Sequence, residues 1–166
     1  NVNHGIDMLS SSNNVFTDIT ANQQEESYAA IGLYSSSDNN TFTNLNVSDN
    51  AYYGVRVDSS SNNTFTDITA NSNDYESISL YESSSNDFSN INSIGSYSGI
   101  ALNTGTENNF TNATLDEGSY GVVLTTSSNN NVFTDITANL NSEYENLKVE
   151  FSSDIASSGL NQSVNI

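Results

Sequence analysis

Carboxylates recur at one fixed place in this sequence, and paired carboxylates are the groups that glycoside hydrolysis requires. The segment "VFTDITAN" at 15–22 returns almost unchanged at 64–71 and 132–139, which places Asp18, Asp67 and Asp135 at equivalent positions. If the repeats stack, Asp18 and Asp67 lie two coils apart, about 9–10 Å, near the upper limit for an inverting pair. Asn44 occupies the same position in the repeat between them. Because Asp and Asn both favour bends, the pattern favours a bend-forming position, and we predict no catalytic residue.

Lyase chemistry, which needs a basic residue beside a bound cation, has few candidate residues in this sequence. Arg56 and Lys148 are the only Lys and Arg residues, and His4 is the only His. Arg56 and Lys148 each stand between two apolar residues of an alternating segment, so we expect them to point outward as isolated surface charges. His4 has no cluster of other ligands at metal-binding spacing. The sequence therefore predicts neither lyase nor hydrolase activity and no cofactor or metal site.

The charge balance excludes one class of partner. Twenty acidic residues against two basic ones give a net charge of -18, which argues against nucleic acid, whose phosphates need Lys and Arg. The absence of Cys excludes disulfides and thiolate metal sites. No apolar run of about 18 residues occurs, so no membrane span is predicted.

Acidic residues also gather before one corner of the repeat, where stacked carboxylates would repel one another. They are Glu25, Glu26, Asp49, Asp74, Glu76, Asp116, Glu117, Glu143 and Glu145. Ca²⁺ prefers several oxygen ligands, so weak Ca²⁺ binding is one expectation. No segment matches a defined calcium loop, and a solvated acidic face is the alternative.

The positions of Phe reveal the repeat that must carry these side chains. They are Phe16, Phe42, Phe65, Phe88, Phe110 and Phe133, at spacings of 22 to 26 residues. A second segment of each repeat alternates with period two, which indicates a strand. Its apolar pairs are Ile6/Met8, Ile31/Leu33, Val55/Val57, Ile78/Leu80, Ile100/Leu102, Val122/Leu124 and Leu147/Val149. Repeats of this length indicate a solenoid, and the Leu pattern of leucine-rich repeats is absent.

The sequence therefore predicts an all-β fold, a right-handed single-stranded parallel β-helix of about seven coils of 22–26 residues. Equivalent residues would form columns about 4.7–4.9 Å apart. The Asn two residues before each Phe would form a hydrogen-bonded ladder. The last coil, near Ile155, departs from the pattern. We expect residues 1–166 to form one β-helix domain, a processed form or fragment of a longer surface protein, because the chain opens directly in repeat text.

Tyrosines form the most informative row outside the core. Each falls two or three residues before an inward strand residue, at one predicted corner: Tyr28, Tyr52, Tyr75, Tyr97, Tyr120 and Tyr144. One interpretation is aromatic stacking that stabilises the coil. The other is a platform on which sugar rings stack.

Sequons for N-glycosylation, Asn-x-Ser/Thr, accompany the repeats. They begin at Asn39, Asn46, Asn62, Asn109, Asn112 and Asn161. They permit glycosylation of a secreted protein.

The segments "SSSNNTFT" and "YGVRVDSSSNN" give this sequence the style of a known family. Over nearly the whole chain, it resembles the NosD-like parallel β-helix repeats of microbial surface proteins. These repeats are also described as carbohydrate-binding and sugar-hydrolase domains. The resemblance implies a β-helix, in a family that includes copper-maturation proteins, polysaccharide-acting enzymes and cell-surface modules. No catalytic motif of the family falls on a residue of this sequence.

Together these observations predict a non-catalytic extracellular β-helix, a structural or adhesive module at a microbial cell surface. Its expected partners are copies of itself, stacked end to end in a filament or layer, or neighbouring repeats of the same protein, and glycans are a further expectation. The alternative is a carbohydrate-binding or polysaccharide-processing module. A polar site beside the tyrosines would separate these interpretations: a groove with convergent carboxylates would favour the enzyme, and a plain ladder the structural rod.

Overall fold

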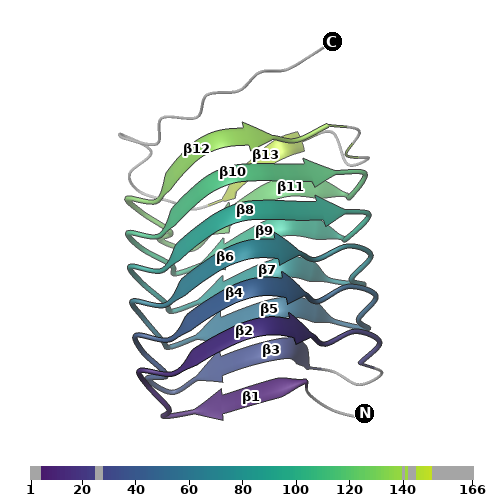
Figure 1. Ribbon diagram of the computed structural model, residues 1–166. Helices are drawn as coiled ribbons and strands as arrows, with labels where there is room; N and C mark the ends of the chain where they lie inside the picture. The colour runs from purple at the N-terminus through teal and green to yellow at the C-terminus, as the bar shows by residue number, and fades with distance from the viewer. Residues whose placement is uncertain (1–4, 25–27, 140, 142–144, 151–166) are drawn as a thin grey trace.

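The computed structural model describes residues 5–24, 28–139, 141 and 145–150, the last segment as backbone alone. Every regular element in these ranges is a β-strand (Figure 1). The strands are β1 (Ile6–Leu9), β2 (Val15–Thr20), β3 (Ala29–Tyr34), β4 (Thr41–Asn46), β5 (Tyr53–Asp58), β6 (Thr64–Thr69), β7 (Glu76–Tyr81), β8 (Asp87–Ile94), β9 (Ser98–Asn103), β10 (Asn109–Asp116), β11 (Tyr120–Thr125), β12 (Val132–Thr137) and β13 (Glu145–Glu150). None of the described residues belongs to a helix that could span a bilayer.

The strands form two parallel sheets, one with the odd-numbered strands and one with the even-numbered strands after β1. The seven-stranded sheet runs β1-β3-β5-β7-β9-β11-β13, and the six-stranded sheet runs β12-β10-β8-β6-β4-β2. Each turn of the chain therefore contributes one strand to each sheet, and the described strands make about six turns (Figure 1). The predicted parallel β-helix is confirmed. The irregular coil expected near Ile155 lies outside the described residues.

Phenylalanine rings fill the core behind the six-stranded sheet. The register aligns Phe with Phe on every pair of neighbouring strands from β2 to β12. Adjacent ring centroids lie between 4.6 and 5.1 Å apart with nearly parallel planes. The apolar pairs of the seven-stranded sheet face these rings and are buried from Ile31 to Leu124. Identical letters recur because each coil must present the same shape to the coils on either side.

An asparagine ladder fixes the bend before each Phe. The Asn40 backbone N–H donates to Asn63 Oδ1 at 2.8 Å, and the Asn40 side-chain amide donates to the same oxygen at 3.1 Å. The same pair of bonds links Asn63 to Asn86, and it recurs along the stack. The predicted hydrogen-bonded Asn column is confirmed. It satisfies backbone groups that the bend would otherwise bury without partners.

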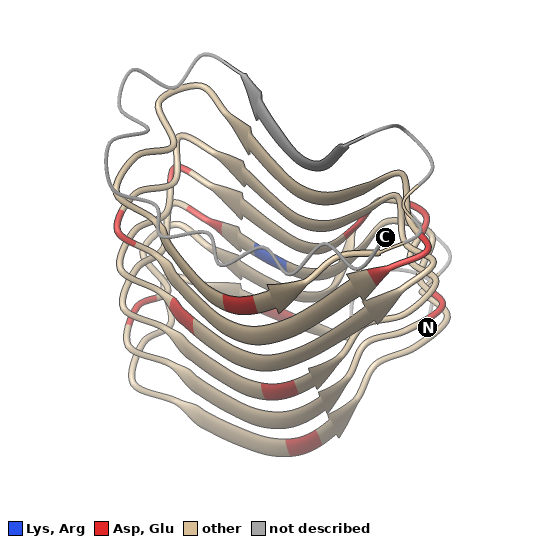
Figure 2. Ribbon diagram, turned by 90° about the horizontal axis from the view of Figure 1, so that it is seen from above, with Lys and Arg blue, Asp and Glu red and all other residues tan. Residues whose placement is uncertain are grey.

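Bends of left-handed conformation shape the outer edge of the coil. Asp18, Asn44, Asp67, Asn90 and Asn112 have φ between 55° and 58°, values at which Asp and Asn are favoured among residues with a side chain. Viewed along the stack, the two sheets face each other and the seven-stranded sheet bows toward the other (Figure 2). Its outer face is therefore the hollow side of the molecule.

Candidate functional site

Three rows of outward side chains cross the seven-stranded sheet, and the strand register defines them. The central row is Gly32, Arg56, Ser79, Ala101 and Val123. One flanking row is Tyr34, Asp58, Tyr81, Asn103 and Thr125. The other flanking row contains Tyr53, Glu76, Ser98 and Tyr120. Because most central residues are small and most flanking residues are larger, the outer face of the sheet is recessed along the central row.

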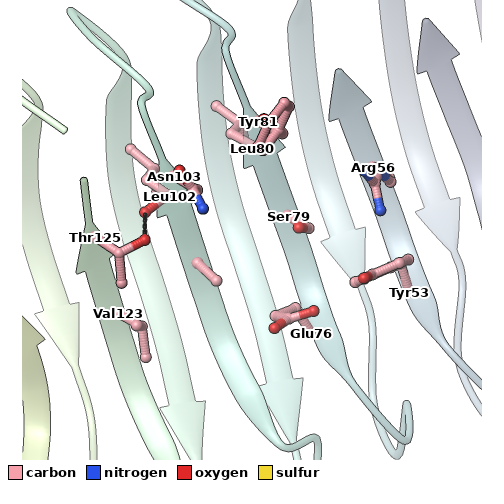
Figure 3. Close-up of a pocket in the computed structure, with 11 residues that line it drawn as sticks. Tyr53, Arg56, Glu76, Ser79, Leu80, Tyr81, Leu102, Asn103, Val123 and Thr125 are labelled. Atoms are coloured by element: carbon pink, nitrogen blue, oxygen red, sulfur yellow. Dashed lines mark hydrogen bonds between the residues drawn. The ribbon is translucent and has the colours of Figure 1, made fainter. Parts of the chain in front are cut away.

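This surface contains a cavity of about 280 Å³, which we call the groove. It is bounded at one end by Arg56 and Tyr53 on β5 and extends across β7 and β9 to Val123 and Thr125 on β11 (Figure 3). The lining residues are Tyr53, Arg56, Glu76, Ser79, Leu80, Tyr81, Ala101, Leu102, Asn103, Val123 and Thr125. Hydroxyl, amide and carboxylate groups thus surround a floor that is apolar at Ala101 and Val123.

Arg56 is held at one end of the groove by two contacts. Its Nη2 atom donates to Asp58 Oδ2 at 3.1 Å, and its guanidinium carbon lies 5.1 Å from the centroid of the Tyr53 ring. The prediction that Arg56 is an isolated surface charge is therefore wrong. Burial acts to lower the pKa of the guanidinium, but the hydrogen bond to Asp58 and the neighbouring Tyr53 hold that pKa above its ordinary value. For Lys148, the other predicted surface charge, the side chain lies outside the described part.

Two tyrosine side chains, Tyr34 and Tyr53, interact electrostatically with the guanidinium. Burial raises the pKa of Tyr34 to about 12, and burial together with the charge of Glu76 raises the pKa of Tyr53. Both phenols are therefore neutral at physiological pH. The Tyr34 ring lies over Gly32, where a Cβ atom would collide with it. The missing side chain at Gly32 is thus what allows Tyr34 to lie next to Arg56.

Two polar atoms of the groove are buried without a hydrogen-bond partner. They are Glu76 Oε2 and Arg56 Nε. Burial also raises the pKa of the Glu76 carboxyl group, because the charged form loses hydration. Unpartnered buried polar atoms are uncommon in folded proteins and cost stability. Two lining residues thus each hold one unpaired polar atom below the surface of the groove, and a ligand meets these atoms only when the side chains turn toward it.

The predicted tyrosine column is correct in part. Tyr52 and Tyr75 stack face to face with ring centroids 4.5 Å apart, and their backbones are hydrogen-bonded. Tyr120, however, pairs in register with Ser98 and not with Tyr97, so its placement in this column is wrong. Its ring meets Tyr97 edge-on, at 5.7 Å and 77°.

The remaining corner tyrosines keep an exposed position where the structure describes them. Tyr28 and Tyr97 are about half exposed. Tyr144 lies outside the described residues. Tyr53, the neighbour of Tyr52, contacts both stacked rings and also lines the groove. The corner stack and the groove are therefore adjacent parts of one surface.

The repeated carboxylates lie on the opposite, six-stranded sheet. Asp67 is exposed at φ 58°, and its Oδ1 accepts a hydrogen bond from Asn90 Nδ2 at 2.8 Å. Asp18 accepts from Asn44 in the same way at 2.6 Å. Asp135 has the same left-handed backbone. This geometry agrees with the bend-forming interpretation, and the column is remote from the groove.

The acidic residues before the corner do not share one column. Asp49 and Glu117 lie in one column with Ser72 and Gly95, and all four residues have a left-handed backbone conformation. Asp116 is paired with Ile94, and Glu76 lines the groove. No group of three or more His, Cys, Asp or Glu side chains is placed to hold a metal ion in the part that the structure describes. Weak Ca²⁺ binding stays a prediction, and Glu25, Glu26, Glu143 and His4 lie outside that part.

The sequons occupy two kinds of position. Asn39 and Asn62 are exposed at left-handed bends. Asn46 and Asn109 are half-buried, and Asn109 and Asn112 donate hydrogen bonds to neighbouring coils. Asn161 lies outside the described residues. Glycosylation stays a prediction, and the geometry is most favourable at Asn39 and Asn62.

Comparison with known proteins places the chain by its fold. A family model described as "Right handed beta helix region" matches residues 4–153. No curated protein matches the sequence. Two crystal structures of the periplasmic alginate epimerase AlgG, the first of a mutant, are similar at TM-scores of 0.74 and 0.70 and 16% identity. The matches cover 89% and 90% of this chain but 41% of each epimerase chain, so it spans less than half of that enzyme. Because the family model covers most of the sequence, the chain belongs to the right-handed β-helix family.

Proposed function

We propose that this chain is a non-catalytic carbohydrate-binding module that acts outside the cell, and that the groove on the seven-stranded sheet is its binding site. The observation that carries the proposal is the pair of buried, unpartnered atoms, Glu76 Oε2 and Arg56 Nε, in a cavity of about 280 Å³. Ligand sites combine a concave, partly apolar surface with a few convergent polar groups. A polar site beside the tyrosines was the feature expected to distinguish the carbohydrate alternative from a plain structural rod.

The residues around these two atoms suit a sugar. Tyr53 and Tyr81 provide aromatic faces and hydroxyl groups, and Asn103 and Thr125 add polar groups along one side. Tyr81 is the most accessible of the aromatic rings lining the groove, at 38% exposure. A sugar ring has apolar C–H faces and a hydroxyl-bearing edge, so it can contact the ring and the polar groups at once.

The carboxylates of the groove support binding more than turnover. Glycoside hydrolysis commonly uses two carboxyl groups that flank the scissile bond. Glu76 is the one carboxylate among the residues that line the cavity. The neighbouring Asp58 is engaged on both oxygens, by Arg56 at 3.1 Å and by the Ser59 hydroxyl at 2.9 Å. A second free carboxylate is therefore missing from the lining that the structure describes.

The similar structures support a polysaccharide ligand in a general way. AlgG is an alginate epimerase, so a fold similar to this one occurs within a protein that acts on a polysaccharide. The resemblance at 16% identity concerns the fold, and the proposal for this chain depends on its own groove. A module of this kind would serve the adhesive role expected from the sequence, by attaching the protein to a glycan.

Affinity electrophoresis of the folded chain through gels that contain polysaccharides tests this proposal. We expect retardation by at least one polysaccharide, and at least a tenfold loss of affinity, about 1.4 kcal/mol, in Tyr81→Ala. Val132→Ala, which changes an exposed side chain on the six-stranded sheet, is the matched control and should migrate like the native protein. Tyr97→Ala removes a corner tyrosine that does not line the groove, so it tests whether the corner or the groove binds the polysaccharide. Absence of retardation by every polysaccharide would reject the proposal and favour a structural rod.

A further inference from the structure

The proposed binding site allows the class of polysaccharide to be inferred. We propose that the groove binds an uncharged polysaccharide, through hydroxyl groups that meet Glu76 and Arg56, and that it discriminates against polyuronates such as alginate. This inference rests on the proposed function and adds the chemistry of the ligand to it. Four properties of the groove and of the chain carry it.

The first property is the hydrogen-bonding capacity of the two unpartnered atoms. Glu76 Oε2 needs a donor, and Arg56 Nε needs an acceptor. A sugar hydroxyl can donate and accept, so hydroxyl groups can satisfy both atoms. A ligand carboxylate is ionised and accepts only. It could pair with Arg56, but it would leave Glu76 buried beside a second negative charge.

The second property is the local charge. Arg56 is the single cation among the described side chains that line the groove, and it is already paired with Asp58 at 3.1 Å and packed against the Tyr53 ring. With Glu76 nearby, the formal charge of Arg56, Asp58 and Glu76 together is -1, from one cation and two anions. A uronate carboxylate that paired with Arg56 Nε would share the guanidinium with Asp58 and bring another negative charge next to the ion pair. An uncharged sugar can bind while that ion pair stays intact.

The third property is the length of the groove. It crosses from β5 to β11, three steps between strands, or about 14 Å at the usual strand spacing. A polyuronate lying along it would bring several carboxylates into the site. Beyond Arg56 the central row offers Ser79, Ala101 and Val123, none of which is charged. The row continues past the groove at Lys148 on β13, whose side chain lies outside the described part. Among the described side chains that line the groove, none beyond Arg56 is therefore a cation for the later sugar units.

The fourth property acts at long range. The chain carries a net charge of -18, with 20 acidic residues and two basic ones. A field of this sign slows the approach of a polyanion, and salt weakens the effect because it screens exposed charges. An uncharged polymer feels neither the repulsion nor the screening. The two classes of ligand should therefore differ in their dependence on salt.

Isothermal titration calorimetry of the folded chain with soluble uncharged β-glucan, galactomannan and xyloglucan, and with alginate and polygalacturonate of matched length, tests the inference. In 0.15 M NaCl we expect at least one uncharged polymer to bind at least tenfold more tightly than either polyuronate. Its affinity should change less than twofold in 1 M NaCl. Glu76→Gln should weaken the uncharged ligand about fivefold or more, because the amide keeps the shape but loses the charged acceptor. Thr134→Ala on the six-stranded sheet is the control and should bind normally.

The outcomes separate this inference from the proposed function. If a polyuronate binds as tightly as the uncharged polymers, or more tightly, the charge discrimination is refuted and carbohydrate binding stands. If uncharged polymers bind but Glu76→Gln does not weaken them, the assignment to this groove is refuted. If none of the polymers binds, both the inference and the proposed function are refuted. Circular dichroism of each variant checks that the β-helix is retained.

Discussion

Replacing Asn63 with Ala should lower the free energy of unfolding by about 3 kcal/mol, because one side-chain amide serves two neighbouring coils. Its Oδ1 accepts from the Asn40 backbone N–H at 2.8 Å and from Asn40 Nδ2 at 3.1 Å. Its Nδ2 donates to Ser61 O at 3.2 Å and to Asn86 Oδ1 at 3.1 Å. Asn40, Asn63 and Asn86 are all buried, so water does not replace the lost partners.

The magnitude follows from which groups lose their last partner. The Asn40 backbone N–H becomes an unpaired buried donor, which costs about 1–3 kcal/mol. Asn40 Nδ2 keeps a bond to Ser11 O, and Asn86 Oδ1 keeps the bond from the Asn63 N–H. The remaining losses therefore add about 1 kcal/mol in total. The backbone at residue 63 can still form its bend, since Ala does not alter the main chain.

Urea denaturation followed by circular dichroism measures this effect. With a denaturant slope of about 2 kcal/mol per molar, the midpoint should fall by about 1.5 M. Asn62→Gly is the matched control at the next residue, because Asn62 is exposed with φ 59° and Gly adopts that conformation without strain. Its stability should change by less than about 0.5 kcal/mol. A loss below 1 kcal/mol in Asn63→Ala, or equal losses in both variants, would refute the role assigned to the ladder.

Substitutions at three positions test the bends, the packing and the groove. Asp67→Ala should lower the free energy of unfolding by about 1–2 kcal/mol, because Ala is strained at φ 58°. Asp67→Gly should melt at nearly the native temperature. Equal melting temperatures for the two variants would contradict the bend-forming role. Gly54→Ala should destabilise by about 1–3 kcal/mol in urea, because a Cβ there would lie 2.7 Å from the Ser77 carbonyl oxygen; an unchanged midpoint would show that the coil relaxes freely. Burial raises the pKa of Glu76, so its contribution to stability is present below the unfolded pKa of about 4.3 and is lost as the pH rises through the folded pKa. Glu76→Gln should therefore melt higher than the native protein at pH 7 and show no advantage below about pH 4, and a lower melting temperature at pH 7 would contradict the unpaired state of this carboxylate.

The fold could be predicted because stacking converts repetition in the sequence into columns in space. Phe42, Phe65 and Phe88 are one coil apart, and a position that recurs with the coil must meet its own copies above and below. The same reasoning gave the Asn ladder, since an amide can donate to the next amide along the stack. A second ladder, in which Gln24 and Asn50 donate from their backbones to Asn50 and Asn73, was missed. It lies at the other corner, where loop sequences vary.

The tyrosine row shows why pattern reasoning failed beside the strands. Tyr97 stands three residues before Ile100, whereas Tyr120 stands two residues before Val122. In a strand, a shift by one residue moves a side chain to a different row. Tyr120 therefore aligns with Ser98. Requiring the same number of residues between each tyrosine and the inward strand residue that follows it would have separated the two rows.

The groove was not predicted, because its residues do not repeat. Arg56 was treated as one outward charge between two inward residues, which is correct for its direction but says nothing of its neighbours. Those neighbours come from other coils, such as Glu76, or from two residues along the strand, such as Asp58. The signal that could have revealed the site was the run of small residues across the central row, including Gly32 and Ser79, on either side of Arg56.

Repetition and function thus occupy different positions in the same coil. A column that packs or hydrogen-bonds to its own copies, such as the Phe stack, can change in one coil only at a cost in the coils on either side. The outward rows of the seven-stranded sheet have no such constraint, and there Arg56 and Glu76 each occur once in their rows among the described side chains. The two atoms left unpaired at these positions reduce stability. Since the ladder and the core would remain intact if these residues were apolar, the fold does not require Arg56 and Glu76 at these positions, whereas the proposed ligand does.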